Sequence, residues 1–157
     1  MADSPRDLAT ALILETFRLN GRLLATGDRL VADLGLTSAR WQVLGAVAMA
    51  AHPGPIAHVA RSMGLARQNV RRIVGDLVEA GLLQLAPNPH HRRAPLVLLT
   101  EGGSAVFAAA SARQAPWAEA LTAGLEPDAI RTALAVARTL RERLEDPEPE
   151  ELAPDDV

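Results

Sequence analysis

Residues 56 to 100 read IAHVARSMGLARQNVRRIVGDLVEAGLLQLAPNPHHRRAPLVLLT, and this stretch decides the fold. Apolar residues at helical spacing predict a short helix ending at Gly64, because glycine is common just past a helix end. A second helix follows and stops at Gly81. Its apolar residues recur at intervals of three and four, which places them on one buried face. They are Val70, Ile73, Val74, Leu77 and Val78. Two strands, Leu82 to Ala86 and Leu96 to Leu99, are then predicted around a polar loop.

The opposite face of the second helix has the composition of a DNA-reading surface. Its exposed side chains are predicted to be Arg67, Gln68, Asn69, Arg71 and Arg72. Arginine matches the two acceptors of guanine in the major groove, and glutamine or asparagine matches the donor and acceptor of adenine. A surface helix of no special function would more often interleave acids with bases for ion pairs. Residues 67 to 72 contain three arginines, two amides and no acid, which favours DNA contact.

Helix, turn, helix and hairpin in this order predict a winged helix-turn-helix. Three further runs, GLTSARWQVLGAV at 35–47, GLL at 81–83 and LTEGG at 99–103, extend the pattern. With them the chain resembles the MarR family of dimeric bacterial transcriptional regulators over about residues 8 to 144. The resemblance implies a mainly α fold with a small β-hairpin wing, in a single domain of residues 1–157. It implies a DNA lobe over 37–100 and a dimerisation lobe built from helices in 7–34 and 101–144.

The loop from Pro87 to Pro95 departs from the family pattern. In resembling proteins this wing loop carries acids and arginines, and one arginine enters the minor groove. Here Asn88 and His91 stand where relatives have acids, so we expect no acid–arginine brace and a less firmly held loop. The DNA-binding candidates of the wing are His90, Arg92 and Arg93, and the pattern leaves open which of them enters the groove. Protonation of the paired histidines would add positive charge, although a plain solvated loop is the simpler interpretation.

The formal net charge of −3 conceals an uneven distribution along the chain. Residues 56 to 93 contain six arginines against Asp76 and Glu79, a net charge of +4. Residues 145 to 157 contain seven acids and no base, and this acidic, proline-containing tail is predicted to be disordered. The positive segment coincides with the DNA-reading pattern, and contacts to phosphates supply most sequence-independent affinity.

Apolar stripes also mark the two ends of the chain. Residues 7 to 33 are predicted to form a long helix with more apolar surface than a small domain needs. Packing against a second subunit, as the resemblance implies, and packing within the chain both explain it. Pro116 is expected to kink or divide a helix over residues 101 to 121, and a last helix is predicted over Pro127 to Leu144.

Several classes of function are disfavoured. The chain has no cysteine, which removes disulfides, thiolate metal sites and cysteine oxidation sensing. It has no phosphate loop, GxSxG or HExxH, and its four histidines lack metal-ligand spacing. We therefore expect neither an enzyme nor a cofactor. No apolar run approaches a membrane span and the N-terminus is not signal-like, so we expect a cytoplasmic protein without a membrane partner.

Two functions fit these patterns. The first is a homodimeric regulator, more often a repressor than an activator, that binds a pseudo-palindromic double-stranded operator. The resemblance adds a small-molecule effector, often an anionic aromatic, bound between the two lobes; no residue of this chain is assigned to that site. The second is a winged helix that serves only protein interaction or dimerisation and does not bind DNA.

Overall fold

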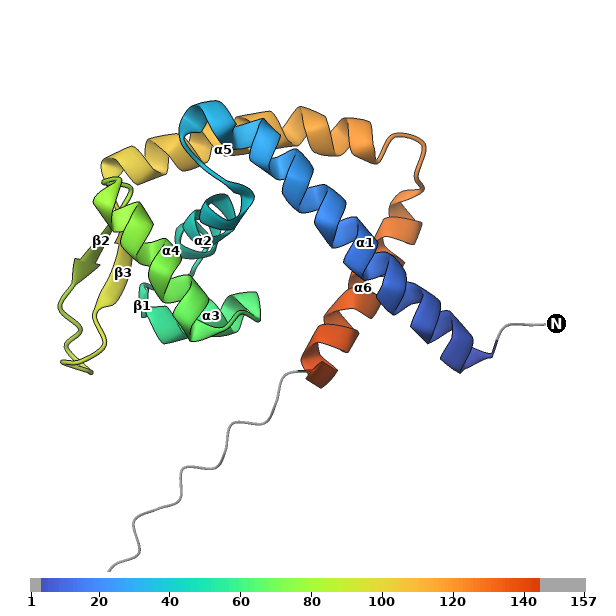
Figure 1. Ribbon diagram of the computed structural model, residues 1–157, viewed down its shortest axis with the longest axis horizontal. Helices are drawn as coiled ribbons and strands as arrows, with labels where there is room; N and C mark the ends of the chain where they lie inside the picture. Colours follow the sequence, from blue (N-terminus) through green and yellow to red (C-terminus); the bar gives the residue numbers. More distant parts are fainter. Residues whose placement is uncertain (1–3, 145–157) are drawn as a thin grey trace, which may run out of the picture. The chain divides into compact units, whose positions relative to one another are not determined.

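The structure is a computed structural model that describes residues 4–144 (Figure 1). These residues form two compact units, one up to Ala118 and one from Glu119. The first contains α1 (Pro5–Val31), the 3₁₀ turn η1 (Ala32–Leu34), α2 (Ser38–Ala48), β1 (Gly54–Pro55), α3 (Ile56–Met63), α4 (Arg67–Glu79), β2 (Leu83–Ala86), β3 (Leu96–Leu99) and most of α5 (Glu101–Leu121). The second contains the end of α5 and α6 (Pro127–Leu144). The predicted mainly α fold with a small β wing is confirmed.

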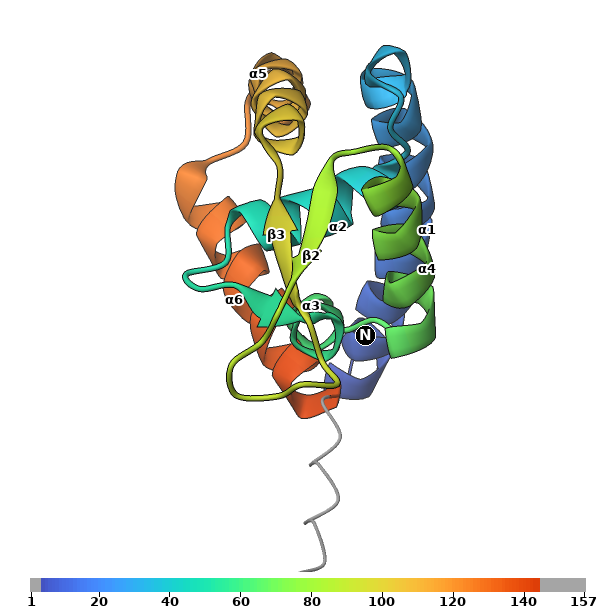
Figure 2. The ribbon, with the colours of Figure 1, turned by 90° about the vertical axis from the view of Figure 1, so that its left-hand side faces the viewer.

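The small sheet has one more strand than the sequence predicted. Strands β2 and β3 form the expected antiparallel hairpin, with Leu83 opposite Leu99 and Ala86 opposite Leu96 (Figure 2). The two-residue strand β1 pairs on the other side of β3, with Gly54 opposite Val97. Periodicity could not predict β1, because two residues carry no periodic pattern. Proline is compatible with an edge strand, where its missing N–H leaves no ladder bond unmade.

The helix ends follow local capping chemistry. Ser4 caps α1 through a capping box with Asp7, so the helix starts at Pro5, two residues earlier than predicted. The Thr37 hydroxyl caps α2 by accepting from the Arg40 N–H at 3.3 Å. Gly64 ends α3 in the left-handed conformation at φ 62°, a value that a side chain would strain.

The core of the first unit is assembled around α4. Val70, Ile73, Val74 and Leu77 of α4 are buried, as predicted, and Val78 is half-buried. They join the buried residues Val43 and Leu44 of α2, Val59 and Ala60 of α3, and Leu83 and Val97 of the sheet. Burying about four aliphatic side chains stabilises the fold by roughly 1.5–3 kcal/mol each before entropy is counted. The packing fixes the rotation of α4 about its axis and turns its polar face outward.

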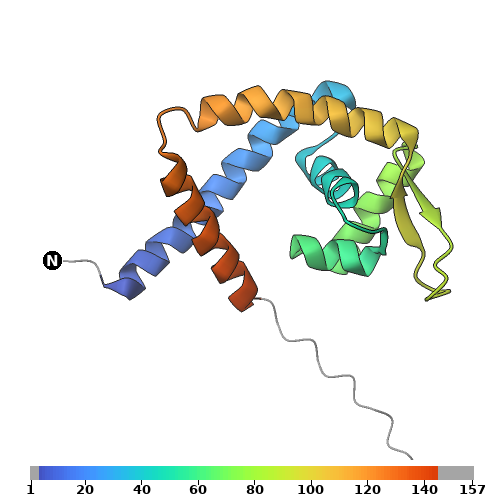
Figure 3. The same ribbon diagram turned by 180° about the vertical axis from the view of Figure 1, so that it is seen from behind.

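Helix α5 runs without interruption from Glu101 to Leu121 with Pro116 inside it, so of the two expected effects, a kink or a division, Pro116 does not divide the helix (Figure 3). Pro116 is exposed, and it lacks the N–H that would continue the hydrogen-bond ladder at this position. Arg113 of α5 donates to the carbonyl of Leu30 at 3.4 Å and to the carboxylate of Asp33. The hydrogen bond from the Arg113 guanidinium holds the pKa of the Asp33 carboxyl below its usual value.

Apolar side chains remain exposed on α1 and α6. Phe17 is 71% exposed, and the first unit leaves uncovered Leu8, Leu12, Ile13, Leu14 and Leu19. Helix α6 has no buried residue, although its apolar positions recur at helical spacing as predicted. The acidic tail predicted to be disordered comprises residues 145 to 157, which lie outside the described residues. Within residues 4–144, no helix combines the length and apolar character required to cross a membrane.

Gly103 is a position where a side chain has no room. A Cβ at Gly103 would overlap the carbonyl oxygen of Leu82, whereas a Cβ at the adjacent Gly102 would make only ordinary contacts, the nearest at 3.7 Å. We expect Gly103→Ala to lower the free energy of unfolding by about 1–3 kcal/mol through overpacking. Gly102→Ala should leave it unchanged or raise it by up to about 1 kcal/mol. Chemical denaturation of the two variants checks this, and equal stabilities would contradict it.

Candidate nucleic-acid interface

The polar face of α4 is presented to solvent as the sequence predicted. The turn at Gly64 separates α3 from α4, and the buried stripe of α4 faces α2, α3 and the sheet. Its exposed side chains include all five predicted readers, Arg67, Gln68, Asn69, Arg71 and Arg72. Ala66 occupies the N-cap position and provides no side-chain hydrogen bond. The first turn of α4 therefore leaves backbone donors without a side-chain cap at its positive end, next to these residues.

Cations of α4 and of the wing line one groove. The groove has a volume of about 270 Å³ and lies between the start of α3, α4, β2 and the end of the wing loop. Arg67, Arg71 and Arg93 line it over a floor that includes Val74 and Leu85, and none of its lining residues is acidic. The structure thus places three of the predicted DNA-binding arginines, from two separate elements, along a single cationic groove.

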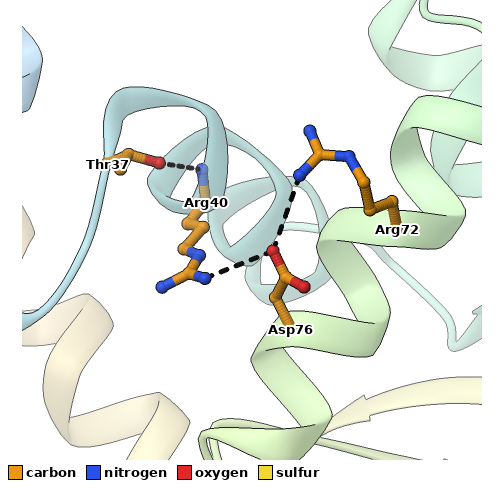
Figure 4. A network of polar contacts seen from close by, with 4 residues as sticks. All are labelled: Thr37, Arg40, Arg72 and Asp76. Carbon is orange, nitrogen blue, oxygen red and sulfur yellow. Dashed lines mark hydrogen bonds and ion pairs between the residues drawn. The ribbon is translucent and has the colours of Figure 1, made fainter.

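Arg72 lies outside this groove and takes part in a different arrangement. Its Nη1 is 3.7 Å from Oδ2 of Asp76, one helical turn further along α4 (Figure 4). The same Oδ2 accepts a hydrogen bond from Nη2 of Arg40, on α2, at 3.2 Å. The spacing of Arg72 and Asp76 is visible in the sequence, but sequence analysis did not single out Asp76 as a partner. Arg40 is thirty-six positions from Asp76, and only the fold shows that they meet.

The wing loop has a brace that sequence analysis missed. The side-chain amide of Asn88 donates from Nδ2 to the carbonyl of Ala94 at 2.9 Å, and its Oδ1 accepts from the N–H of His90 at 3.0 Å. Asn88 therefore joins the two sides of the loop in place of the acid–arginine pair of the family pattern. The signal available in the sequence is that asparagine readily bonds to nearby backbone groups in turns. The side chains of His90, Arg92 and Arg93 are all exposed.

A second, larger cavity lies within the first unit. It is an open cleft of about 1130 Å³ bounded by α1, α2, the β1 segment, α3 and α5. The chain has four aromatic residues, and three of them, Trp41, Phe107 and Trp117, line this cleft. His52 and His58 also line it, and no carboxylate or arginine does. The cleft therefore suits a largely apolar, flat ligand. Among residues 4–144, no group of three or more potential metal ligands was found.

Comparison of the sequence with known proteins identifies its family. A family model described as MarR family matches residues 34–94, from the end of η1 into the wing loop. An uncharacterized protein of Mycobacterium tuberculosis is 38% identical over 125 residues, which cover 80% of this chain and 86% of that protein. The chain belongs to the MarR family. This family and its fold are those of transcriptional regulators.

A further relative and two solved structures extend the comparison. The transcriptional activatory protein BadR of Rhodopseudomonas palustris is 32% identical over 108 residues, covering 68% of this chain and 62% of BadR. CouR from Rhodococcus jostii, bound to p-coumaroyl-CoA, matches with a TM-score of 0.75 at 22% identity, covering 85% of this chain and 94% of CouR. A mutant MarR from E. coli in complex with operator DNA matches with a TM-score of 0.67 at 25% identity, covering 82% of this chain and 94% of that one.

For this MarR-family chain, the eight residues predicted to bind DNA are all exposed, on α4 and on the wing. The structure brings Arg67, Arg71 and Arg93 together, and it separates Arg72, which faces Asp76. Contact of each of the eight with DNA stays a prediction. The groove, the Arg40–Asp76 contact and the aromatic cleft are the features that the sequence did not show.

Mutation of Asn88 tests whether its side-chain hydrogen bonds hold the wing loop. We expect Asn88→Ala to remove two hydrogen bonds from the wing loop and so raise the rate of amide hydrogen exchange in residues 87 to 95. The free energy of unfolding should fall by no more than about 1–2 kcal/mol, because surface loops contribute little to the core. His91→Ala, at an exposed neighbour in the same loop, is the matched control. Unchanged exchange in Asn88→Ala would show that the amide does not hold the loop.

Proposed function

We propose that the chain is a sequence-specific regulator that binds double-stranded DNA as a homodimer and represses transcription until a small molecule releases it. The observation that carries the proposal is the groove lined by Arg67, Arg71 and Arg93, beside an α4 face without acids in its first two turns. Phosphates fit the groove, and base edges fit the exposed amides of Gln68 and Asn69. His90 and Arg92, at the wing, reach toward flanking backbone or minor groove.

The homodimer is proposed from the uncovered apolar surface. The first unit leaves the stripe of α1 exposed, and α6 exposes Ile130, Leu134 and Val136. Contiguous apolar surface of this kind commonly marks an interface. We assign residues 7–34 and 101–144 to dimerisation, 37–100 to DNA binding, and the whole of 1–157 to one MarR-like domain. Two α4 helices related by a two-fold axis read half-sites about 34 Å apart, which makes the operator pseudo-palindromic.

Release by a ligand is proposed from the aromatic cleft. CouR, whose fold this chain shares, is bound to p-coumaroyl-CoA. A ligand bound between α1, α2 and α5 releases DNA when it binds the dimer state that cannot bind DNA more tightly than the state that can. The size of the shift depends on the difference between these two ligand affinities. An aromatic acid or its thioester is the proposed class of effector. BadR is named an activatory protein, so transcription assays decide the direction of regulation. We place this activity in the cytoplasm, with no membrane partner.

The alternative is a winged helix used only for protein contact. It leaves unexplained why six of the sixteen basic residues lie between residues 56 and 93, while most of the acids lie elsewhere. Both functions predict a folded dimer, and only the first predicts recovery of a defined DNA sequence.

Recovery and sequencing of genomic fragments bound by the purified protein at about 150 mM salt tests the proposal, because low salt exaggerates non-specific binding. We expect a shared inverted repeat. The double variant Arg71→Ala, Arg72→Ala should lose it while remaining a folded dimer by circular dichroism and light scattering. The control Arg6→Ala removes a positive charge outside the residues assigned to dimerisation and to DNA binding, and should keep the repeat. Recovery by the wild type no better than by the α4 variant would favour the protein-contact alternative.

The effector proposal has an intrinsic reporter, because both tryptophans of the chain line the cleft. Titration with free aromatic carboxylic acids and p-coumaroyl-CoA should quench tryptophan fluorescence and release the operator with the same midpoint. Trp41→Phe and Trp117→Phe each leave one reporter, and both should quench at equal ligand concentration. Release of DNA without any change in fluorescence would place the effector elsewhere.

A further inference from the structure

Arg40 of α2 and Arg72 of α4 both contact Asp76 of α4. We propose that Asp76, anchored by Arg40, is a positioning residue that orients Arg72 to read a guanine in each operator half-site. The inference rests on the proposed DNA-binding function and adds to it a specificity determinant outside the set of residues that contact DNA.

The geometry centres on one carboxylate oxygen. Oδ2 of Asp76 accepts from Nη2 of Arg40 at 3.2 Å and lies 3.7 Å from Nη1 of Arg72. Figure 4 shows the two guanidinium groups approaching this oxygen from opposite sides, one from α2 and one from α4. The shorter contact, to Arg40, is the hydrogen bond, and the longer one, to Arg72, is an ion pair. Asp76 is therefore held by Arg40 and remains in place as a fixed negative charge beside Arg72.

The anchor is tied to the body of the domain. Arg40 lies in the first turn of α2, whose N-cap is Thr37, and its own N–H donates to the Thr37 hydroxyl at 3.3 Å. Val43 and Leu44 of the same helix are fully buried. The side chains of Arg40 and Asp76 are only 36% and 32% exposed, so water screens this pair less than it screens an ion pair on an open helix surface.

Asp76 restricts the orientation of the Arg72 side chain but leaves most of it exposed for contact with a base. Its side chain is 70% exposed, and its second terminal nitrogen points away from Asp76 (Figure 4). Arg72 lies one turn beyond Gln68, so both side chains emerge from the same face of α4. An unrestrained arginine loses much side-chain conformational entropy on binding a base edge. A fixed carboxylate that already orients the side chain makes the entropy lost on binding smaller. The benefit is largest for bidentate guanine recognition, which requires a set orientation of the guanidinium plane.

The cationic groove gives the contrast within the same site. Arg67, Arg71 and Arg93 line it with no acidic residue among the lining side chains. Arginines without a fixed carboxylate tolerate many orientations, which suits phosphate oxygens better than base edges. The structure therefore divides the arginines into a group that supplies affinity and one residue, Arg72, that supplies sequence preference.

The test compares base preferences of purified full-length variants, measured by selection from randomised half-sites. Arg72→Ala first identifies the position that Arg72 reads. We expect Asp76→Asn to lower the preference for guanine at that position by about threefold to tenfold, with other positions unchanged. Glu79→Gln is the matched control, because it removes the same charge from the same helix and should raise overall affinity equally without changing any preference. Circular dichroism and thermal unfolding report whether each variant is folded.

Arg40→Gln is the second variant. If Asp76→Asn does not fold, Arg40→Gln still tests whether the anchored carboxylate affects the guanine preference. It removes the anchor, retains Asp76 and Arg72, and should weaken the same guanine preference. Adding Asp76→Asn to Arg72→Ala should cause no further loss there. Two results would overturn the inference and leave the regulator function intact. In the first, Asp76→Asn and Glu79→Gln have the same base preferences. In the second, Arg72→Ala lowers the base preference at no position of the half-site. Failure of the wild-type protein to select any sequence overturns both.

Discussion

The interaction on which the rest of the structure depends is the burial of the apolar stripe of α4. A helix has two faces, and once Val70, Ile73, Val74 and Leu77 are enclosed by α2, α3 and the sheet, the rotation of α4 is fixed. The placement of every polar side chain of that helix follows. The cationic groove exists because the same packing sets the wing beside α4, so that an arginine from each side faces a shared space. The hydrophobic effect therefore determines the geometry, and the charges act within it.

The features that the sequence predicted are those encoded by local periodicity and by strong local signals. The stripe of α4, the glycine at the end of α3 and the hairpin strands all depend on neighbours within a few residues. The β1 strand escaped prediction because its two residues acquire their structure only from pairing with β3. The uninterrupted α5 shows the converse: a proline is a strong local signal, yet the helix continues through it.

The candidate site also combines features that the sequence predicted with features that it did not. The exposure of Arg67, Gln68, Asn69, Arg71 and Arg72 followed from the helical pattern. The partner of Asp76 required knowledge of which turn of α2 meets which turn of α4. The wing was predicted to be loosely held because one kind of brace was missing. Asn88 supplies another by bonding across the loop, and a pattern based on charge does not register a neutral amide. The aromatic cleft draws Trp41, Phe107 and Trp117 from two helices far apart in sequence, which no periodicity within one helix could reveal.

Thr100 has a mechanical consequence for the whole first unit. Its hydroxyl donates to the carbonyl of Gly81 at 2.7 Å and accepts from the N–H of Gly103 at 2.9 Å, while its own N–H donates to Leu82 at 3.1 Å. A hydroxyl has one proton, so its donor capacity is already committed to this joint. Hydrogen bonds of Thr100 thus join the end of α4, the start of the wing and the start of α5. A tilt of α5 at this end therefore either breaks these hydrogen bonds or moves the end of α4 and the start of the wing with it.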